Sequence, residues 1–411
     1  MSTQQRRRRQ KASAPSVGSM VTAAVLAYGT YQLANWAWQS WTKTEDEEQE
    51  QPAISGMRDV IVSDPPRQRH NLDISRQRWR LRRQRMERCR EETANALIDF
   101  LPTMRRAIEN LTDTTLETKE LKRMRSERSE DSRSEEKEHW DSIKTKAMTK
   151  MITTAYGHSI LLLVLTVQVH LLGGHLFDEK MKIQTTARSI GADSLASDRM
   201  TSYQASHRLV LTRTYEYFFE TGIVLLAETV ERAVMTVMGD WDVTNPESIN
   251  TTSEMLNDAI QEIREIVEGR SKKSSRRPRS ILRFLLPTEQ AADFENEDDL
   301  ARSTLDETWD LMESPVFEDA LRDSLCATFD IMKNQFWLHI FLDDQGNLPE
   351  HVCQYTKKPL ATVVTKLKAT SNSFYIQKPF SPFSSKSSTS KYIPVIQQIR
   401  TILELGDVSF N

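Results

Sequence analysis

The stretch that decides the fold is residues 140–177, WDSIKTKAMTKMITTAYGHSILLLVLTVQVHLLGGHLF. Apolar side chains recur every three or four residues through its first half, at Trp140, Ile143, Ala147, Met151 and Ala155. This spacing places them on one face of an α-helix. The second half contains Ile160–Val167, the most apolar run of the chain. We therefore predict one long helix that is amphipathic at its start and apolar on every side further along.

The apolar run has two interpretations. A second membrane span requires about 18 or more apolar residues. The run is only eight residues long and is bounded by His158, Gln168 and His170. A core helix that is buried on all sides in a large bundle is therefore favoured. Gly173 and Gly174 are predicted to end this helix, because glycine is common just beyond helix C-termini.

A basic helix precedes this stretch. Residues 76–90, RQRWRLRRQRMERCR, contain eight arginines. The residues that follow keep a helical apolar spacing, at Leu97, Leu101, Met104, Ile108 and Leu111. The pattern predicts one long amphipathic helix that begins near Ile74. Such arginines can bind nucleic acid or anionic lipid, but no binding module accompanies them. A solvated helix face close to a membrane is favoured, and no nucleic-acid partner is expected.

The remaining sequence predicts a bundle. Helical spacing is found at 207–238, 254–268, 316–342, 360–369 and 393–405. Polar insertions are predicted near 122–138, 178–205, 269–300 and 371–391. The first of them is either a flexible insertion or an exposed helix extension, and the others are predicted to be surface loops. We predict an all-α fold, a large elongated helical bundle that occupies residues 74–411.

The composition supports a helical protein. Of 411 residues only 12 are glycine, which disfavours the glycine-dependent turns of nucleotide-binding α/β folds and of β-sandwiches. The 55 basic and 58 acidic side chains nearly balance, so the whole chain has no bias toward nucleic acid. Cys89, Cys326 and Cys353 are too widely spaced for a zinc site or a disulfide framework. A reducing compartment fits this cysteine usage best.

The amino terminus predicts a membrane anchor. A basic tail, residues 1–16, carries Arg6, Arg7, Arg8, Arg9 and Lys11. Residues 17–38, VGSMVTAAVLAYGTYQLANWAW, contain no charge, and as a helix they reach about 33 Å, enough for one transmembrane span. A cleaved signal peptide or a transit peptide is the alternative, but no small-x-small cleavage site follows. Residues 39–73, which are acidic and rich in proline, are predicted to be a flexible linker.

The sequence lacks the patterns of catalytic and metal sites. It contains no phosphate-binding glycine motif, no H-E-x-x-H and no G-x-S-x-G. His158, His170 and His175 do not have the spacing of metal ligands on one helix, so core or boundary histidines are favoured. No catalytic residue, metal or cofactor is predicted. A receptor, tether or scaffold is suggested instead, and Trp140 is the best partner-binding candidate, with a role in closing the end of the core as an equal alternative.

Several landmarks together resemble a known family. The segment that ends at Leu111, RRQRMERCREETANALIDFLPTMRRAIENL, is followed by the helix that begins with Trp140 and then by LLLVLTVQVHLLGGHLF. With the basic amino terminus and one membrane segment, this order resembles the peroxisomal biogenesis factor 3, or peroxin-3, family over residues 78–177. The resemblance implies a peroxisomal membrane receptor with a cytosolic all-α bundle. That bundle would dock peroxisomal biogenesis factor 19, a soluble chaperone that carries newly made membrane proteins and presents an amphipathic helix near its amino terminus.

The resemblance also implies which residues dock the chaperone. The W-x-x-[LI]-K pattern of the family falls on Trp140, Ile143 and Lys144. A T-x-x-L-K pattern, extended without gaps from Leu101-Pro102-Thr103, falls on Thr118, Leu121 and Lys122. The charged connection between the two patterns is longer than is usual in the family, which leaves open whether Leu121 lies beside Trp140. The tryptophan and aliphatic side chains would provide most of the affinity, and the lysines a charged rim.

Family topology places the amino terminus inside the organelle and the bundle in the cytosol. The positive-inside rule predicts the opposite orientation, and we follow the family. The basic tail and anchor would then target the chain to the peroxisomal membrane, directly or by way of the endoplasmic reticulum. Peroxisomal lipid and adaptors for organelle inheritance or selective autophagy are further partners that the family suggests. The alternatives are a tether that binds anionic lipid through residues 76–90 and a membrane enzyme with an unrecognised site.

Overall fold

The computed structural model describes residues 66–127, 133–190, 193–243, 250–270, 281–286, 299–333, 338–341, 356–373 and 400–410. The predicted basic tail, the predicted anchor at 17–38 and most of the predicted linker lie outside these residues. The linker prediction extends too far along the chain, because α2 begins at Pro66 rather than near residue 74. Proline is favoured in the first turn of a helix, where the missing N–H is not needed.

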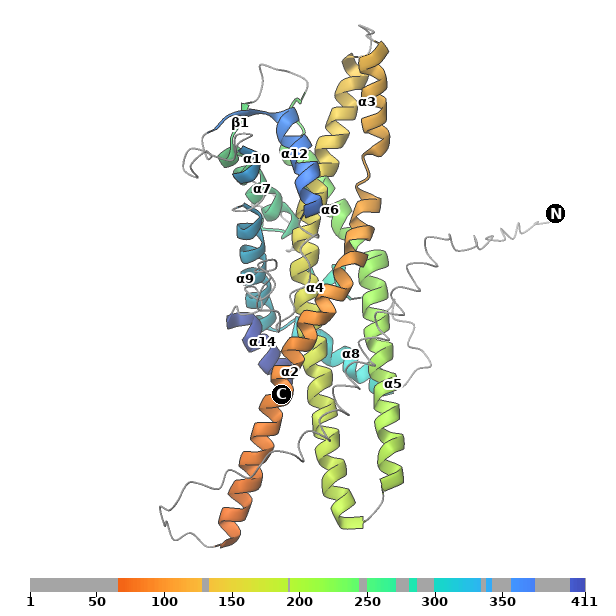
Figure 1. Cartoon of the computed structure of the whole chain (residues 1–411), viewed down its shortest axis with the longest axis vertical. Helices are drawn as coiled ribbons and strands as arrows, with labels where there is room; N and C mark the ends of the chain where they lie inside the picture. The colour runs from red at the N-terminus through yellow and green to blue at the C-terminus, as the bar shows by residue number, and fades with distance from the viewer. Residues whose placement is uncertain are drawn as a thin grey trace, which may run out of the picture.

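Helices make up nearly all of the described chain, and the molecule is elongated (Figure 1). In chain order they are α2 (Pro66–Leu111), α3 (Thr115–Glu127), α4 (Arg133–Ile190), α5 (Asp193–Tyr217), the π-helix η2 (Phe218–Gly222), α6 (Ile223–Met238), α7 (Ser253–Val267), the 3₁₀-helix η3 (Ile281–Phe284), α8 (Asp299–Met312), α9 (Pro315–Met332), α10 (Leu338–Phe341), α12 (Leu360–Ser373) and α14 (Arg400–Phe410). Within the described ranges, β1 (Asn250–Thr251) and β2 (Lys358–Pro359) form one short antiparallel pair. The predicted all-α class is confirmed.

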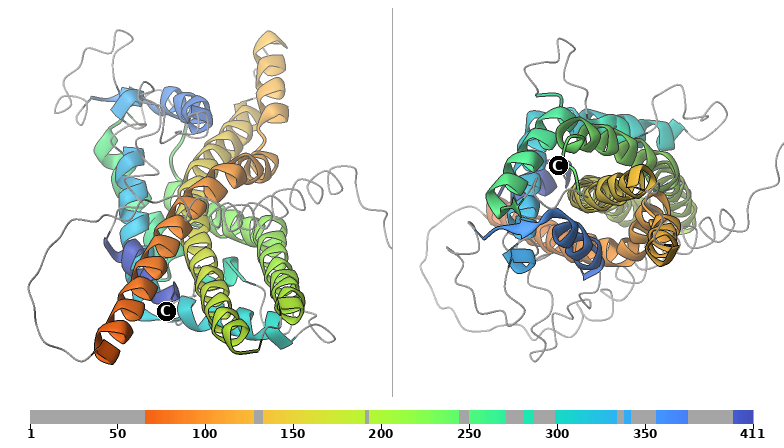
Figure 2. Two further views of the ribbon diagram at one scale, coloured as in Figure 1. Left: turned by 60° about the horizontal axis from the view of Figure 1, so that its bottom comes forward. Right: turned by 90° about the horizontal axis from the view of Figure 1, so that it is seen from above.

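The long helix α4 runs through the middle of the bundle. The view from above in Figure 2 shows the other helices around it, and α2, α6, α9, α12 and α14 all pack against it. Ile160 and the three leucines that follow it are fully buried. By length and composition α4 is apolar enough to cross a membrane, but 89% of its most apolar 18-residue window is buried inside the protein. The apolar run therefore forms the core of the bundle, as predicted.

The prediction that Gly173 and Gly174 end this helix is wrong, because α4 continues to Ile190. A Cβ atom on Gly173 would clash with the Cys89 sulfur on α2. A Cβ atom on Gly174 would clash with the backbone carbonyl of Phe410 on α14. The two glycines therefore allow α2 and α14 to approach α4 closely, and they do not end the helix.

The predicted loop at 178–205 is also wrong. The end of α4 and the beginning of α5 fill this region, with only residues 191–192 outside the description, and they form the helical hairpin at the lower end of Figure 1. The segment contains four alanines and two each of lysine, glutamine, arginine and methionine, all of which are good helix formers even where no apolar stripe is present. A polar composition was therefore a poor guide to loop structure in this segment.

Three other segments refine the predicted bundle. In the predicted insertion at 269–300, Phe284 at the end of η3 and the two leucines after it are buried in the core. The sequence did not predict α8, because threonines at 304 and 308 occupy buried positions and obscure the apolar period. The exposed-extension interpretation of 122–138 fits its described parts, since α3 extends to Glu127 and α4 begins at Arg133. The predicted insertion at 371–391 lies outside the described residues except for the end of α12.

The arginine-rich part of α2 is mostly solvated, as predicted. Arg76, Arg78 and Arg80 are exposed, and so is Trp79. Arg85 is the exception, because it is buried and its Nη1 lies 3.1 Å from Oε1 of Glu92. One arginine of the run therefore belongs to the core packing of α2 against α4.

Candidate docking surface

A polar turn between α2 and α3 fixes the position of the projecting end of the molecule, which α3 and the first turns of α4 form and which is called the tip below. Asp113 Oδ1 accepts hydrogen bonds from the backbone N–H of Thr115 at 2.9 Å and from its hydroxyl at 2.6 Å. These hydrogen bonds lower the pKa of the Asp113 carboxyl. Such a turn orients the first N–H groups of a helix, so α3 begins here and runs back along the start of α4. The two helices project together at the top of Figure 1.

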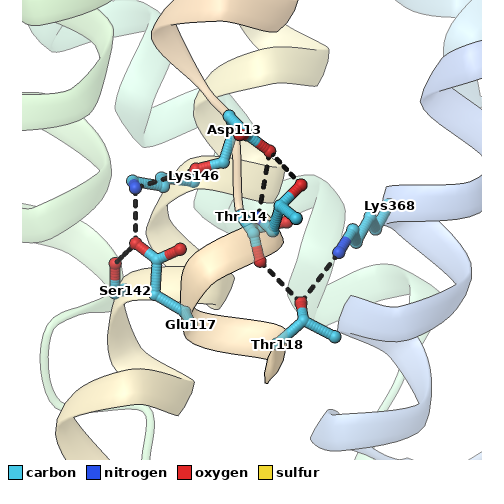
Figure 3. Close-up of polar contacts among 8 residues, drawn as sticks. Asp113, Thr114, Glu117, Thr118, Ser142, Lys146 and Lys368 are labelled. Carbon is cyan, nitrogen blue, oxygen red and sulfur yellow. Dashed lines mark hydrogen bonds and ion pairs between the residues drawn. The ribbon is translucent and has the colours of Figure 1, made fainter. Parts of the chain in front are cut away.

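A lysine on α4 ties this turn in place, as Figure 3 shows. The ammonium group of Lys146 donates to Oε1 of Glu117 at 2.5 Å and to the backbone carbonyl of Asp113 at 2.9 Å. Ser142 donates to the same carboxylate oxygen at 3.2 Å. Partial burial acts to raise the pKa of Glu117, but these hydrogen bonds and the Lys146 charge outweigh it, and the pKa is lowered. The carboxylate is therefore charged and holds α3 against α4.

A second polar link joins α3 to a helix that lies far away in the sequence. The Thr118 hydroxyl donates to the backbone carbonyl of Thr114 at 2.6 Å. The Thr118 hydroxyl oxygen in turn accepts a hydrogen bond from the ammonium group of Lys368 on α12 at 3.0 Å (Figure 3). The predicted site residue Thr118 thus fastens α12 to the tip.

A small apolar cluster lies beneath these contacts and is separate from the main core. This tip cluster comprises Leu121, Ile143, Ala147, Val243, Leu360 and Val364, with Trp140, Trp241 and Ala361 packed against it. Leu121 and Ile143 are each only 5% exposed. The structure therefore brings Leu121 and Trp140 into one cluster, although a long charged connection separates them in sequence.

Trp140 lies at the surface of the tip cluster and is only partly buried. The guanidinium carbon of Arg125 is 5.7 Å from the centre of its ring. An exposed cation over a tryptophan face is a weak favourable contact. The tip thus offers a tryptophan that rests on buried aliphatic side chains and still reaches solvent, which suits the binding of an apolar side chain from another protein.

Comparison with known proteins shows the family of the chain. The sequence model of the Peroxin-3 family matches residues 129–409. This chain belongs to the peroxin-3 family. Peroxisomal biogenesis factor 3 of Bos taurus is 24% identical over 265 residues, which are 60% of this chain and 63% of the relative. The Homo sapiens protein of that name is 23% identical over 261 residues, with the same coverage. The alignments thus span less than two thirds of the length of these relatives.

The family match covers only one of the two predicted docking patterns. Residues 129–409 include Trp140, Ile143 and Lys144 on α4. Thr118, Leu121 and Lys122 on α3 precede the matched residues. Of these three residues, Leu121 lies in the tip cluster with Trp140, so the structure brings the two patterns together at that residue.

The two predicted lysines have different environments. Lys122 is exposed on α3, as a rim position requires. Lys144 is only 1% exposed, and its ammonium donates to Asp141 at 2.9 Å and to the carbonyl of Trp241 at 2.6 Å. A rim position for Lys144 does not agree with this burial. The side chain instead links the residues that follow α6 to α4 through its hydrogen bond to the Trp241 carbonyl.

Sequence reasoning missed several residues of the tip. Lys368, Trp241 and Leu360 come from distant segments, and no local pattern could have indicated them. Arg125 follows Leu121 by one helical turn, so helical spacing could have found it. Leu116 is 75% exposed beside a groove of about 530 Å³. The groove is lined by Leu116, Glu117, Lys119, Glu120, Glu138, His139 and Ser142.

His158 and His170 are buried in the bundle, and His175 is only partly exposed. Burial lowers the pKa of both His158 and His170 to about 4. His170 contacts the backbone carbonyl of Thr166 at 2.8 Å, and His175 contacts Glu307 at 2.8 Å. In the part of the chain that the structure describes, no group of three or more His, Cys, Asp or Glu side chains is placed to hold a metal ion.

Proposed function

We propose that the chain is a docking receptor of the peroxisomal membrane for peroxisomal biogenesis factor 19. In this role it would receive newly made membrane proteins from that chaperone during peroxisome biogenesis. Family membership supports the role in biogenesis. The observation that carries the docking role is the tip cluster, in which Leu121 of α3 and the partly exposed Trp140 of α4 meet on one surface.

The tip is suited to hold an amphipathic helix. Partner helices of this kind bury a few apolar anchors on a shallow apolar surface, and a tryptophan is a common source of the binding energy. The contacts of Lys146 with Glu117 and of Lys368 with Thr118 fix α3 and α12 before the partner arrives. A surface that is ordered in advance loses less conformational entropy on binding.

The same proposal gives the chain one membrane span and no catalytic role. Residues 17–38 would anchor it, and the basic tail with the anchor would direct it to the peroxisome. The bundle would face the cytosol, where the soluble chaperone is found. Lys122, exposed on α3, would steer the approach of the partner helix.

A binding titration tests the docking role. The full chain is placed in phospholipid nanodiscs, and a labelled peptide of the amino-terminal helix of the chaperone is added. Trp140→Ala should weaken binding about thirtyfold or more, which corresponds to about 2 kcal/mol. Trp79→Ala is the matched control, since Trp79 is 61% exposed on α2, far from the tip. Unchanged affinity for Trp140→Ala, with circular dichroism confirming its fold, would contradict the proposal.

A tether that binds anionic lipid is the second candidate. It is favoured by the exposed arginines of α2 at positions 76, 78 and 80 and by exposed Trp79 among them. Full chain in nanodiscs would then capture vesicles of anionic lipid, and the capture would decrease steeply with salt. Loss of capture in Trp79→Ala but not in Trp140→Ala would support the tether over the docking receptor.

A further inference from the structure

The face of α3 that carries Thr118 and Leu121 extends one turn further along the helix, to Arg125. Thr118, Leu121 and Arg125 are spaced by three and four residues, so they share one face of the helix. Leu121 enters the tip cluster, and Arg125 lies over the Trp140 ring. A partner helix that reaches Trp140 from the side of α3 therefore comes within reach of Arg125.

The contacts that Arg125 makes within the protein are weak and easily exchanged. Its Nε lies 3.8 Å from Oε1 of Glu136, which is beyond hydrogen-bond distance. The two side chains are 64% and 32% exposed, so water screens their attraction. A carboxylate from another molecule can replace Glu136 at little cost in free energy.

Trp140 has neighbours of both charges. On α4, Lys137 lies one turn before it and is 51% exposed, but its Nζ is 3.4 Å from Asp242. Glu138 is exposed two residues before Trp140 on the same helix. Arg125 lies over the ring, and its own ion pair is loose. The charge of Arg125 complements a helix whose apolar face is bordered by aspartate or glutamate.

We infer that Arg125 determines specificity at this surface, and that it selects an amphipathic helix with a carboxylate about one turn from the apolar side chain that covers Trp140. This inference rests on the proposed docking function. A guanidinium that stacks on a ring still presents its N–H groups along its edge, where a carboxylate can accept two of them. A partner that covers Arg125 also excludes water, which strengthens the pair. Lysine has no planar group that can stack and pair in this way.

Titrations of the same chaperone helix with three variants of the full chain in nanodiscs test the inference. Arg125→Ala should weaken binding about fivefold to tenfold and reduce the dependence of the association rate on salt. Arg125→Lys should recover the association rate but only part of the affinity. Arg123→Ala is the matched control, because Arg123 is on the same helix but pairs with Glu120 at 2.8 Å on a different face, and it should bind like wild type.

A double-mutant cycle identifies the carboxylate. Each acidic residue of the peptide is changed to alanine in turn, and each peptide is measured against wild type and Arg125→Ala. One acidic residue should lose its effect when Arg125 is absent. Equal or tighter binding of Arg125→Ala, or coupling to no acidic residue, would overturn the inference and leave the docking function in place if Trp140→Ala still binds weakly. Failure of wild type to bind the peptide would instead overturn the docking function, and this inference with it.

Discussion

Two parts of the same helix have opposite roles. The middle of α4 is enclosed by other helices, and Ile160, Leu163 and Leu165 are fully buried in the main core. The first turns of α4 contribute Ile143 and Ala147 to the tip cluster, and Trp140 there remains partly exposed. One continuous helix thus joins a region that stabilises the fold to a region that has surface for a partner. Substitutions in the two regions should therefore have separable effects, on unfolding and on binding.

The largest expected effect is in the main core. Leu163→Ala should lower the free energy of unfolding by about 2–5 kcal/mol, because it removes a fully buried side chain and leaves a cavity. Urea denaturation of the full chain in mild detergent measures the change. Leu116→Ala at the tip is the control, and it should change stability by less than about 0.5 kcal/mol, since Leu116 is 75% exposed. Similar losses in both variants would remove the distinction between the two regions.

Acidification should also act on the core. His158 and His170 on α4 have a folded pKa of about 4, against an ordinary value of 6.5. Between these values the unfolded chain binds protons that the folded chain does not, so stability is full above pH 6.5 and decreases as the pH falls toward 4. Each histidine should cost about 1.4 kcal/mol by pH 5.5.

Urea denaturation at pH 7 and pH 5.5 measures this loss. His158→Gln is expected to be less stable at pH 7, and its loss of stability on acidification should be smaller than that of wild type by about the 1.4 kcal/mol that His158 contributes. A free energy of unfolding that is the same at both pH values would contradict the prediction.

Two glycines of α4 provide a sharper test of packing. Gly174→Ala should lower stability by about 1–3 kcal/mol, because its Cβ would clash with the backbone of Phe410 on α14. Gly157→Ala is the matched control within the same helix. There the added Cβ would meet side-chain atoms, the Met104 sulfur at 3.0 Å and Ile108 Cδ1 at 4.0 Å, and alanine is favoured over glycine in helices by about 1 kcal/mol. The midpoint of thermal unfolding is measured for both variants. Equal changes in the two midpoints would show that Gly174 has no special role in packing.

The smallest expected effect is at the tip. Thr118→Val removes the hydroxyl that accepts from Lys368, and it should cost about 0.5–1.5 kcal/mol and increase hydrogen exchange in α12. Thr365→Val is the control, since that exposed hydroxyl donates only to the Ala361 carbonyl within α12. Faster exchange in both variants, or in neither, would show that the link to α3 does not order α12.

The sequence predicted the parts of the fold whose apolar period is clear. The helix predicted at 254–268 agrees closely with α7, and the apolar run of α4 was correctly placed in the core. Gly173 and Gly174 were misread, because close approach of a neighbouring helix and helix termination both require glycine, and only the packing distinguishes them. Similarly, α8 was missed because buried threonines carry no apolar signal.

The candidate site was predicted only in part, again because contacts between distant segments leave no local pattern in the sequence. Trp140, Ile143 and Leu121 were named from sequence, and the structure places all three in the tip cluster. The burial of Lys144 could not be predicted, because its acceptor is the backbone carbonyl of Trp241, nearly a hundred residues away. Lysines that bind a partner and lysines that fasten a loop look the same in a sequence.

Hydrogen–deuterium exchange on the full chain in nanodiscs, with and without the chaperone helix, tests the division of α4 most directly. Binding should slow exchange in α3 and in the first turns of α4 around Trp140. Exchange in the middle of α4 should be slow in both states, because those residues are buried in the main core. Protection confined to the arginine-rich start of α2, with α3 and Trp140 unchanged, would contradict the assignment of binding to the tip.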